Sequence, residues 1–161
     1  MPYTYDYPRP AVTADIILFS HFQNKDWVLL ILRKYPPFEG CWAIPGGFIE
    51  MDETLEASAL RELEEETGLK GIALKQFRTY GNPGRDPRHR TITVVFTGRC
   101  EGLPKVKGMD DAREAVWHPV DALPKLGFDH DTILKDALQT QGASGFLNRD
   151  DHGSQTLKAE K

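Results

Sequence analysis

Apolar residues gather in two blocks near the start of the chain, and each block is too short to cross a membrane as a helix. They occupy residues 11–19 and 27–33, and residues 23–26 between them are polar. Branched aliphatic side chains are frequent in both blocks, so we expect two strands joined by a hairpin turn. Pro36 and Pro37 follow the second block. Because proline removes a donor from the sheet ladder, we expect a loop there.

The middle of the chain changes from strand-like to helical spacing at a glycine-rich turn. We expect a short strand over residues 41–44, which ends at Pro45, and a helix over residues 55–67. Gly68 follows the last helical residue, where glycine commonly caps a helix C-terminus. The later pattern predicts strands over residues 73–80, 91–99 and 115–118, and a second helix over residues 129–141.

Composition and charge indicate an ordinary globular protein. The 161 residues are 40% apolar and 27% charged, so we expect one domain over residues 1–141 and a flexible polar tail over 142–161. The net charge of -4 argues against nucleic acid or a membrane surface as a partner, because attraction to phosphate needs a basic field. Cys41 and Cys100 are too few for a disulfide framework, and the N-terminus lacks a secretory pattern. A cytoplasmic location fits these observations.

Three glutamates on the first predicted helix carry the clearest chemical signal. Glu62, Glu65 and Glu66 are spaced i, i+3 and i+4, so they share one helix face. Each close pair of like charges costs on the order of 3 kcal/mol before salt screening. A hard divalent cation such as Mg²⁺ or Mn²⁺ would offset this repulsion, because oxygen ligands favour such ions. The alternative is a solvated face with ion pairs from Arg61 to Glu65 and from Glu66 to Lys70, and spacing alone leaves both open.

The same segment resembles the signature of a known enzyme family. The segment matches the Nudix box at every specified position, through Gly47, Glu53 and residues 61–69. The pattern of this box is G-x5-E-x7-R-E-U-x-E-E-x-G-U, where U is aliphatic. The order of predicted elements over about residues 10–141 is also similar to the Nudix fold. The resemblance implies an α/β fold in which a mixed β-sheet lies between α-helices. It also implies Mg²⁺-dependent hydrolysis of a nucleoside diphosphate linked to another group, with Mn²⁺ as a substitute ion.

The resemblance implies a role for each residue of the motif. Arg61 is expected to orient the carboxylates of the motif, and Glu65 is expected to act in catalysis as well as in metal binding. The expected metal ligands are Gly46, through its backbone carbonyl, Glu62, Glu65 and Glu66. The residues expected to hold the geometry of loop and helix are Gly47, Glu53 and Gly68.

The general base of the family often lies on a loop outside the motif, and the loop at 107–117 offers candidates. We expect Asp111 or Glu114 to take this role, and Asp110 lies in the same loop. A carboxylate within reach of the attacking water can accept its proton. The alternative is that the loop is only a polar turn before the next strand.

Several stretches outside the motif resemble the ADP-ribose pyrophosphatase branch of the family and the Nudix domains of regulators of NAD metabolism. They cover residues 7–13, 36–40, 84–88 and 127–130. At the substrate we expect Arg85, Arg88 and Arg90 to bind phosphate oxygens with their guanidinium forks. We expect Asp86 to pair with an arginine or to contact a ribose hydroxyl. We also expect His130 to face the substrate. The alternative is a surface turn with internal salt bridges.

These expectations combine into hydrolysis of ADP-ribose to AMP and ribose 5-phosphate, with a small nucleoside diphosphate derivative as the substrate. Two alternatives stay open: a hydrolase that removes oxidised or noncanonical nucleoside triphosphates, and a non-catalytic ADP-ribose sensor. The related regulators carry a DNA-binding domain after the Nudix domain, and we expect the residues after Gln141 to be too few for one. Because related ADP-ribose hydrolases are commonly dimers, a homodimer is a further expectation.

Overall fold

A mixed β-sheet joins segments from both halves of the chain in this computed structural model, which describes residues 2–143. The strands are β1 (Ala11–Phe22), β2 (Lys25–Arg33), β3 (Trp42–Ala43), β4 (Gly46–Phe48), β5 (Leu74–Tyr80), β6 (Thr91–Glu101) and β7 (Ala112–Pro119). The helices are α1 (Leu55–Thr67) and α2 (His130–Ala143). The main path of the sheet is β3-β2-β1-β6-β5, with β4 paired to β1 and β7 to β2. Strands β1 and β6 are parallel, whereas the other pairs are antiparallel.

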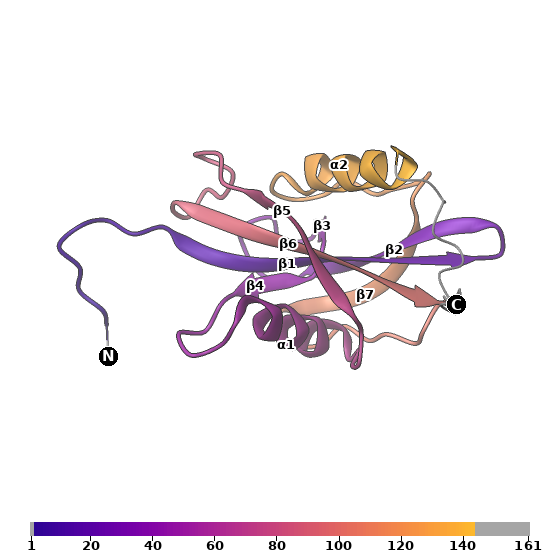
Figure 1. The fold of residues 1–161 in the computed structure, drawn as a ribbon, viewed down its shortest axis with the longest axis horizontal. Helices are drawn as coiled ribbons and strands as arrows, with labels where there is room; N and C mark the ends of the chain where they lie inside the picture. Colours follow the sequence, from indigo (N-terminus) through magenta and orange to yellow (C-terminus); the bar gives the residue numbers. More distant parts are fainter. Residues whose placement is uncertain (1, 144–161) are drawn as a thin grey trace, which may run out of the picture.

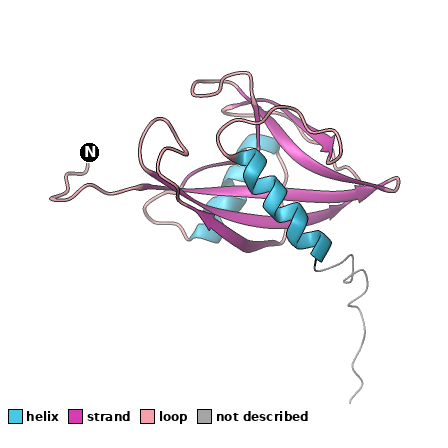
Figure 2. Ribbon diagram, turned by 90° about the horizontal axis from the view of Figure 1, so that it is seen from above, coloured by secondary structure: helices cyan, strands magenta, loops and turns pink. Residues whose placement is uncertain are grey.

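The two helices lie on opposite faces of the sheet (Figures 1 and 2). Each face has its own apolar core, one shared with Leu63 of α1 and the other with Ile133 of α2. Alternate residues of β1 enter the two cores: Ile16 packs toward α1 and Ile17 toward α2. Because both faces of β1 and β2 are buried, their sequences read as nearly continuous apolar runs. The expected α/β fold with a sheet between helices is confirmed.

Helix α1 begins and ends where its local signals predict. The side chain of Thr54 accepts a hydrogen bond from the Ala57 N–H at 3.1 Å, which satisfies a free donor of the first turn. Gly68 caps the C-terminus with φ of 78°, a left-handed conformation that glycine adopts without steric cost.

Other elements differ from their predicted limits. The strand β4 was not predicted, because its two glycines have little strand propensity and it forms through pairing with β1. Strand β7 begins at Ala112 rather than at residue 115, and α2 runs to Ala143 rather than to residue 141. Most of the tail expected over residues 142–161 lies outside the described residues.

The N-terminal segment projects from the start of β1, away from the sheet (Figure 1). Residues 2–10 are exposed along their whole length, and the rings of Tyr3 and Tyr5 stack on each other at 6.2 Å. Cys41 and Cys100 are free thiols, as expected. Within residues 2–143, no helix has the length and apolar character needed to span a bilayer.

Candidate active site

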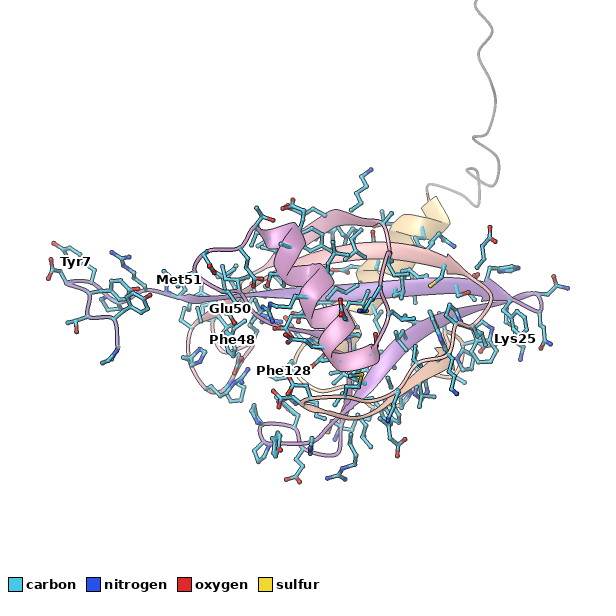
Figure 3. All side chains as sticks on the ribbon, turned by 90° about the horizontal axis from the view of Figure 1, so that it is seen from below. Tyr7, Lys25, Phe48, Glu50, Met51 and Phe128 are labelled. Carbon is cyan, nitrogen blue, oxygen red and sulfur yellow. The ribbon has the colours of Figure 1, made fainter. Side chains whose placement is uncertain are left out.

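A cavity of about 350 Å³ opens where α1, the β3–β4 turn, the loop 81–90 and the start of α2 meet. Carboxylates line one side, which we call the acidic wall; its members are Asp15, Glu62, Glu65 and Glu66. Four arginines also line the cavity, and they are Arg33, Arg61, Arg85 and Arg88. The cavity is therefore charged with both signs. In Figure 3, the labelled Phe48 and Phe128 lie at the end of the molecule nearer the N-terminal segment, far from Lys25 in the β1–β2 hairpin.

Gly47 allows the β4 backbone to approach α1 closely. A Cβ atom at this position would meet the carboxylate of Glu62, so a larger residue would displace that side chain. Glu62 itself is half-buried beside the glycine. Glycine at this position therefore leaves room for the Glu62 carboxylate beside β4.

Arg61 ties the loop before α1 to the glutamates of the helix. Its guanidinium donates to Glu53 at 2.6 Å, to Glu62 at 2.8 Å and to Glu65 at 3.1 Å. It also donates to the backbone carbonyl of Phe48 at 3.1 Å. The hydrogen bond from Arg61 lowers the pKa of Glu53 to about 2. The structure thus brings Arg61 together with three glutamates of the motif.

Three carboxylates of the acidic wall are held out of water. Glu66 is buried, and its Oε2 accepts a hydrogen bond from the Gly46 N–H at 2.9 Å. Burial raises the pKa of Glu66 well above its ordinary value and also raises the pKa of Glu62. Burial raises the pKa of Asp15 to about 6, although the Thr93 hydroxyl donates to its carboxylate. These three groups also repel one another. Of the three, only Glu62 forms an ion pair within residues 2–143, and its partner is Arg61.

The donor chemistry of the acidic wall suits a divalent cation, although its side chains are not arranged around one. The side chains of Asp15, Glu62, Glu65 and Glu66 line this part of the cavity. Their only polar atoms are carboxylate oxygens, which favour Mg²⁺ or Mn²⁺ over softer metals. Within residues 2–143, no three acidic, histidine or cysteine side chains converge as a metal-binding group. Glu62 and Glu65 turn toward Arg61, and Glu66 turns toward Gly46.

A buried hydroxyl without a protein partner also lines the cavity. Thr13 is 7% exposed, and its Oγ1 makes no hydrogen bond to any described residue. Buried polar atoms in proteins are nearly always paired with protein, water or ligand. The Thr13 hydroxyl is an exception to this pattern within residues 2–143.

The loop before β7 brings one of the two predicted base candidates to the cavity. Asp111 and its neighbour Asp110 line the cavity. Glu114 lies on β7, where it is exposed and pairs with Leu32 of β2. Glu114 does not line this cavity, so the geometry favours Asp111 over Glu114.

The arginines of the loop 81–90, which we call the arginine loop, already have protein partners. Arg85 is almost completely buried, with 4% of its side chain exposed, and it binds both carboxylate oxygens of Asp129 at 2.7 and 2.9 Å. Arg88 binds Asp86 in the same two-bonded way, at 2.7 and 3.0 Å. Arg90 donates to the carbonyl of Gly81. The internal salt bridges, which the sequence offered as the alternative to phosphate forks, are present.

His130 lines the cavity but is fixed by the backbone. Its Nδ1 accepts a hydrogen bond from the Ile44 N–H at 3.1 Å, which leaves the ring proton on Nε2. Burial lowers the pKa of His130 to about 3. The ring is therefore neutral near pH 7, and it stabilises the start of α2 beside the cavity.

Sequence reasoning missed three charged residues of the cavity, which are Asp15, Arg33 and Glu50. Asp15 interrupts the apolar run of β1, and Arg33 ends the apolar run of β2. A charged residue in a strand that is buried on both faces is costly unless it has a purpose or a partner. For Asp15 and Arg33 that signal is readable from the sequence, because they lie in or directly after such runs.

Comparisons with known proteins agree with this geometry. A NUDIX domain family model matches residues 9–137. The ADP-ribose pyrophosphatase of Methanocaldococcus jannaschii is 43% identical over 133 residues, which cover 83% of this chain and 76% of that protein. The ADPR responsive transcriptional repressor NtrR of Acinetobacter baylyi is 35% identical over 137 residues, which cover 83% of this chain but only 55% of the repressor.

Solved structures share the fold. The NUDIX domain of Shewanella oneidensis NrtR complexed with ADP ribose matches with a TM-score of 0.77 at 32% identity, covering 84% of this chain and 93% of that one. A MutT/nudix family protein from Enterococcus faecalis matches with a TM-score of 0.78 at 30% identity, covering 86% of this chain and 64% of that one.

Proposed function

The chain belongs to the NUDIX family, and from this premise we propose that it hydrolyses ADP-ribose to AMP and ribose 5-phosphate with Mg²⁺. The observation that carries the proposal is the acidic wall beside arginines in one cavity. Asp15, Glu62 and Glu66 have raised pKa values because they are buried close together. A substrate with two phosphates, bound together with a divalent ion, would complement both signs of charge.

The residues that would hold the ion are the glutamates of the motif, Glu62, Glu65 and Glu66, and the carbonyl of Gly46. When bound, Mg²⁺ supplies Lewis-acid polarisation of the phosphate oxygens and offsets negative charge at the scissile bridge. Arg61 keeps Glu62 and Glu65 oriented through the bonds described above. Release of these glutamates from Arg61 toward a ligand is the rearrangement that this proposal requires.

Asp111 is the residue that we propose as general base. Its position on the cavity lining allows it to take a proton from the attacking water. The water oxygen forms a bond to one phosphorus, and the bond from that phosphorus to the bridging oxygen breaks. The bridging oxygen leaves with the other phosphate, so that AMP and ribose 5-phosphate are the two products.

A substrate panel tests the proposed reaction. The purified protein should hydrolyse ADP-ribose with a higher kcat/KM than NADH, diadenosine polyphosphates or 8-oxo-dGTP in the presence of Mg²⁺. Turnover in ¹⁸O water would then locate the attacked phosphorus through the labelled product. If 8-oxo-dGTP ranked first and ADP-ribose last, removal of damaged nucleoside triphosphates would replace the proposed function.

The similarity to NtrR and to the ADP-ribose complex of the NrtR domain favours a second candidate function. In that case the cavity would bind ADP-ribose as a signal, without turnover. Calorimetry would then show ADP-ribose binding while product analysis showed no AMP. Sequence-specific DNA binding that changes with ADP-ribose would support this regulatory function, whereas turnover without DNA binding would exclude it.

A further inference from the structure

Asp111 lies in the middle of a short loop whose two ends touch each other. The loop runs from Gly108 to Glu114 of β7. A Cβ atom on Gly108 would lie 2.6 Å from both the backbone N and the Cα of Glu114, and 2.7 Å from the carbonyl carbon of Arg113. A side chain at position 108 would therefore have to push apart the two ends of the loop that carries Asp111.

The obstacle at Gly108 is backbone, and this sets it apart from the glycine of β4. At Gly47 a Cβ would meet the Glu62 carboxylate, which belongs to a side chain that is free to rotate about several bonds. The backbone of Glu114 has no such freedom, because it pairs with Leu32 of β2. The room for a side chain at position 108 would have to come from the loop itself.

The loop is also fastened to the last turn of α1, the helix that carries the glutamates of the motif. The Met109 N–H donates to the carbonyl of Glu66 at 3.2 Å. The Lys107 N–H donates to the carbonyl of Thr67, also at 3.2 Å. The last carbonyls of a helix have no partner within the helix. Because these two bonds flank Gly108, they hold it between α1 and β7.

A tight turn then brings Asp111 to the cavity. Asp110 has φ of 52°, in the left-handed region, which aspartate adopts more readily than most residues. The Ala112 N–H donates to the Met109 carbonyl at 2.9 Å across this turn. The Asp111 carbonyl accepts from the Lys34 N–H at 3.1 Å. The backbone of Asp111 is thus held by its own turn and by the end of β2, and the residue lines the cavity.

We propose that Gly108 is a positioning residue for the hydrolysis: its missing side chain lets the loop close on β7 and α1, and this closure sets the place of Asp111. The inference rests on the proposed function, in which Asp111 takes the proton of the attacking water. Misplacement of a reacting group by about 1 Å lowers a rate by about a hundredfold. A methyl group at position 108 should therefore impair proton transfer rather than substrate binding.

Steady-state kinetics of Gly108→Ala test this assignment. We expect kcat for ADP-ribose with Mg²⁺ to fall by about tenfold or more, because the base is displaced. The KM should change by less than about twofold, since position 108 lies outside the cavity lining. A rise in KM with an unchanged kcat would overturn the assignment.

A double-mutant cycle with Asp111→Ala separates positioning from a general loss of stability. Asp111→Ala should lower kcat strongly in the wild type but add little to Gly108→Ala, because the two changes remove the same contribution. If the loss caused by Asp111→Ala kept its full size in the Gly108→Ala background, the assignment would be overturned. If Asp111→Ala alone kept near-normal turnover, the assignment would also fail, while hydrolysis of ADP-ribose would stand.

Gly102→Ala is the matched control for the substitution of a glycine by alanine. Gly102 has φ of 65°, so alanine is strained there, but its Cβ would meet no atom within 4 Å. Gly102 does not line the cavity. The variant should lower the Tm and leave kcat unchanged. Equal losses of kcat in Gly102→Ala and Gly108→Ala would overturn the assignment.

Amide hydrogen exchange tests the geometry without turnover. The Lys107 and Met109 amides should exchange faster in Gly108→Ala than in the wild type, because their bonds to α1 are disturbed. Unchanged exchange would overturn the assignment. If the wild type does not hydrolyse ADP-ribose, the proposed function fails, but amide exchange still tests whether Gly108 sets the place of the loop.

Two variants of Asp110 replace Gly108→Ala if that protein does not fold. Asp110→Gly and Asp110→Val both remove the carboxylate, but only glycine adopts φ of 52° without steric cost. The turn that carries Asp111 should therefore be kept in the glycine variant and disturbed in the valine variant. The kcat of Asp110→Val should be the lower by about tenfold, whereas equal values would overturn the assignment.

Discussion

The acidic wall and the arginine loop face the same cavity, yet they manage charge in opposite ways. In the arginine loop, Arg85 and Arg88 each bind an aspartate through two hydrogen bonds. In the acidic wall, Glu66 accepts one backbone hydrogen bond and repels Glu62 and Asp15. Folding therefore pairs the charges of Arg85 and Arg88, whereas Glu66 and Asp15 form no ion pair within residues 2–143.

This difference separates a structural element from a ligand site. A fully paired cluster is stable without a ligand, and breaking it is costly because the remaining charge is buried. A repelling cluster gains stability when a cation binds or when a charge is removed. Substitutions on the two sides of the cavity should therefore have opposite effects on stability.

The largest expected effect comes from the acidic wall. Glu66→Gln should lower kcat for ADP-ribose by about a thousandfold, because the metal loses a charged ligand. The same change should raise the Tm measured in EDTA, because it removes a buried negative charge. The amide oxygen of the new side chain can still accept the hydrogen bond from the Gly46 N–H. Glu64→Gln is the matched control: Glu64 is exposed and pairs with Lys70 outside the cavity. Near-normal turnover by Glu66→Gln would contradict the metal assignment.

The next effect concerns the arginine loop. Arg85→Met should lower the free energy of unfolding by about 3 kcal/mol, because it leaves Asp129 without its partner. Urea denaturation would measure this loss, and adding Asp129→Asn should recover part of it. Arg113→Gln provides the control, since Arg113 forms an exposed pair with Glu39 at 3.6 Å. Equal losses at Arg85 and Arg113 would show that the buried ion pair contributes no more to stability than the exposed one.

A smaller effect is expected from His130 as the pH falls. Burial lowers its pKa from 6.5 to about 3, so the unfolded chain binds a proton that the folded protein excludes between these values. Acidification from pH 7 to pH 5 should therefore lower the free energy of unfolding by about 2 kcal/mol through His130. Asp15 has the opposite effect: because its pKa is raised to about 6 in the folded protein, its protonation on acidification increases the free energy of unfolding.

The His130→Asn variant isolates the histidine contribution, because asparagine can accept the Ile44 hydrogen bond but does not titrate. Chemical denaturation of both proteins from pH 7 to pH 5 gives the comparison. The stability difference between wild type and variant should shift by the stated amount. Parallel curves over this range would show that His130 is protonated equally in the folded and unfolded states.

The smallest effect is expected at Lys70, where the sequence suggested a pair with Glu66. Lys70 binds Glu64 instead, at 3.1 Å, and both side chains are largely exposed. Lys70→Gln should therefore change the free energy of unfolding by at most about 0.5 kcal/mol and leave kcat unchanged. A clear loss of turnover would indicate that Lys70 acts on the acidic wall after all.

Local signals were sufficient to predict α1 and much of the motif around it. Thr54 and Gly68 set the ends of α1 through contacts within a few residues, so sequence reading gives the limits that the structure shows. The shared face of Glu62, Glu65 and Glu66 likewise follows from helical spacing alone. Such features depend on neighbours along the chain, which the sequence displays directly.

Features that depend on distant pairing were not predictable in the same way. Arg85 meets Asp129 across 44 residues, and nothing in the arginine loop alone identifies that partner. The strand β4 exists because β1 lies beside it. The location of Asp111 on the cavity, with Glu114 away from it, depends on the pairing of β7 with β2.

The position of Asp15 in β1 has a consequence for how the sheet chooses its alignment. Both faces of β1 are apolar around it, so a slip by one residue would still bury hydrophobic side chains. Such a slip would, however, carry the carboxylate away from Thr93 and turn it toward the apolar core beside α1, without a hydrogen-bond donor. The same side chain that lines the cavity thus also favours one register of β1 against β6.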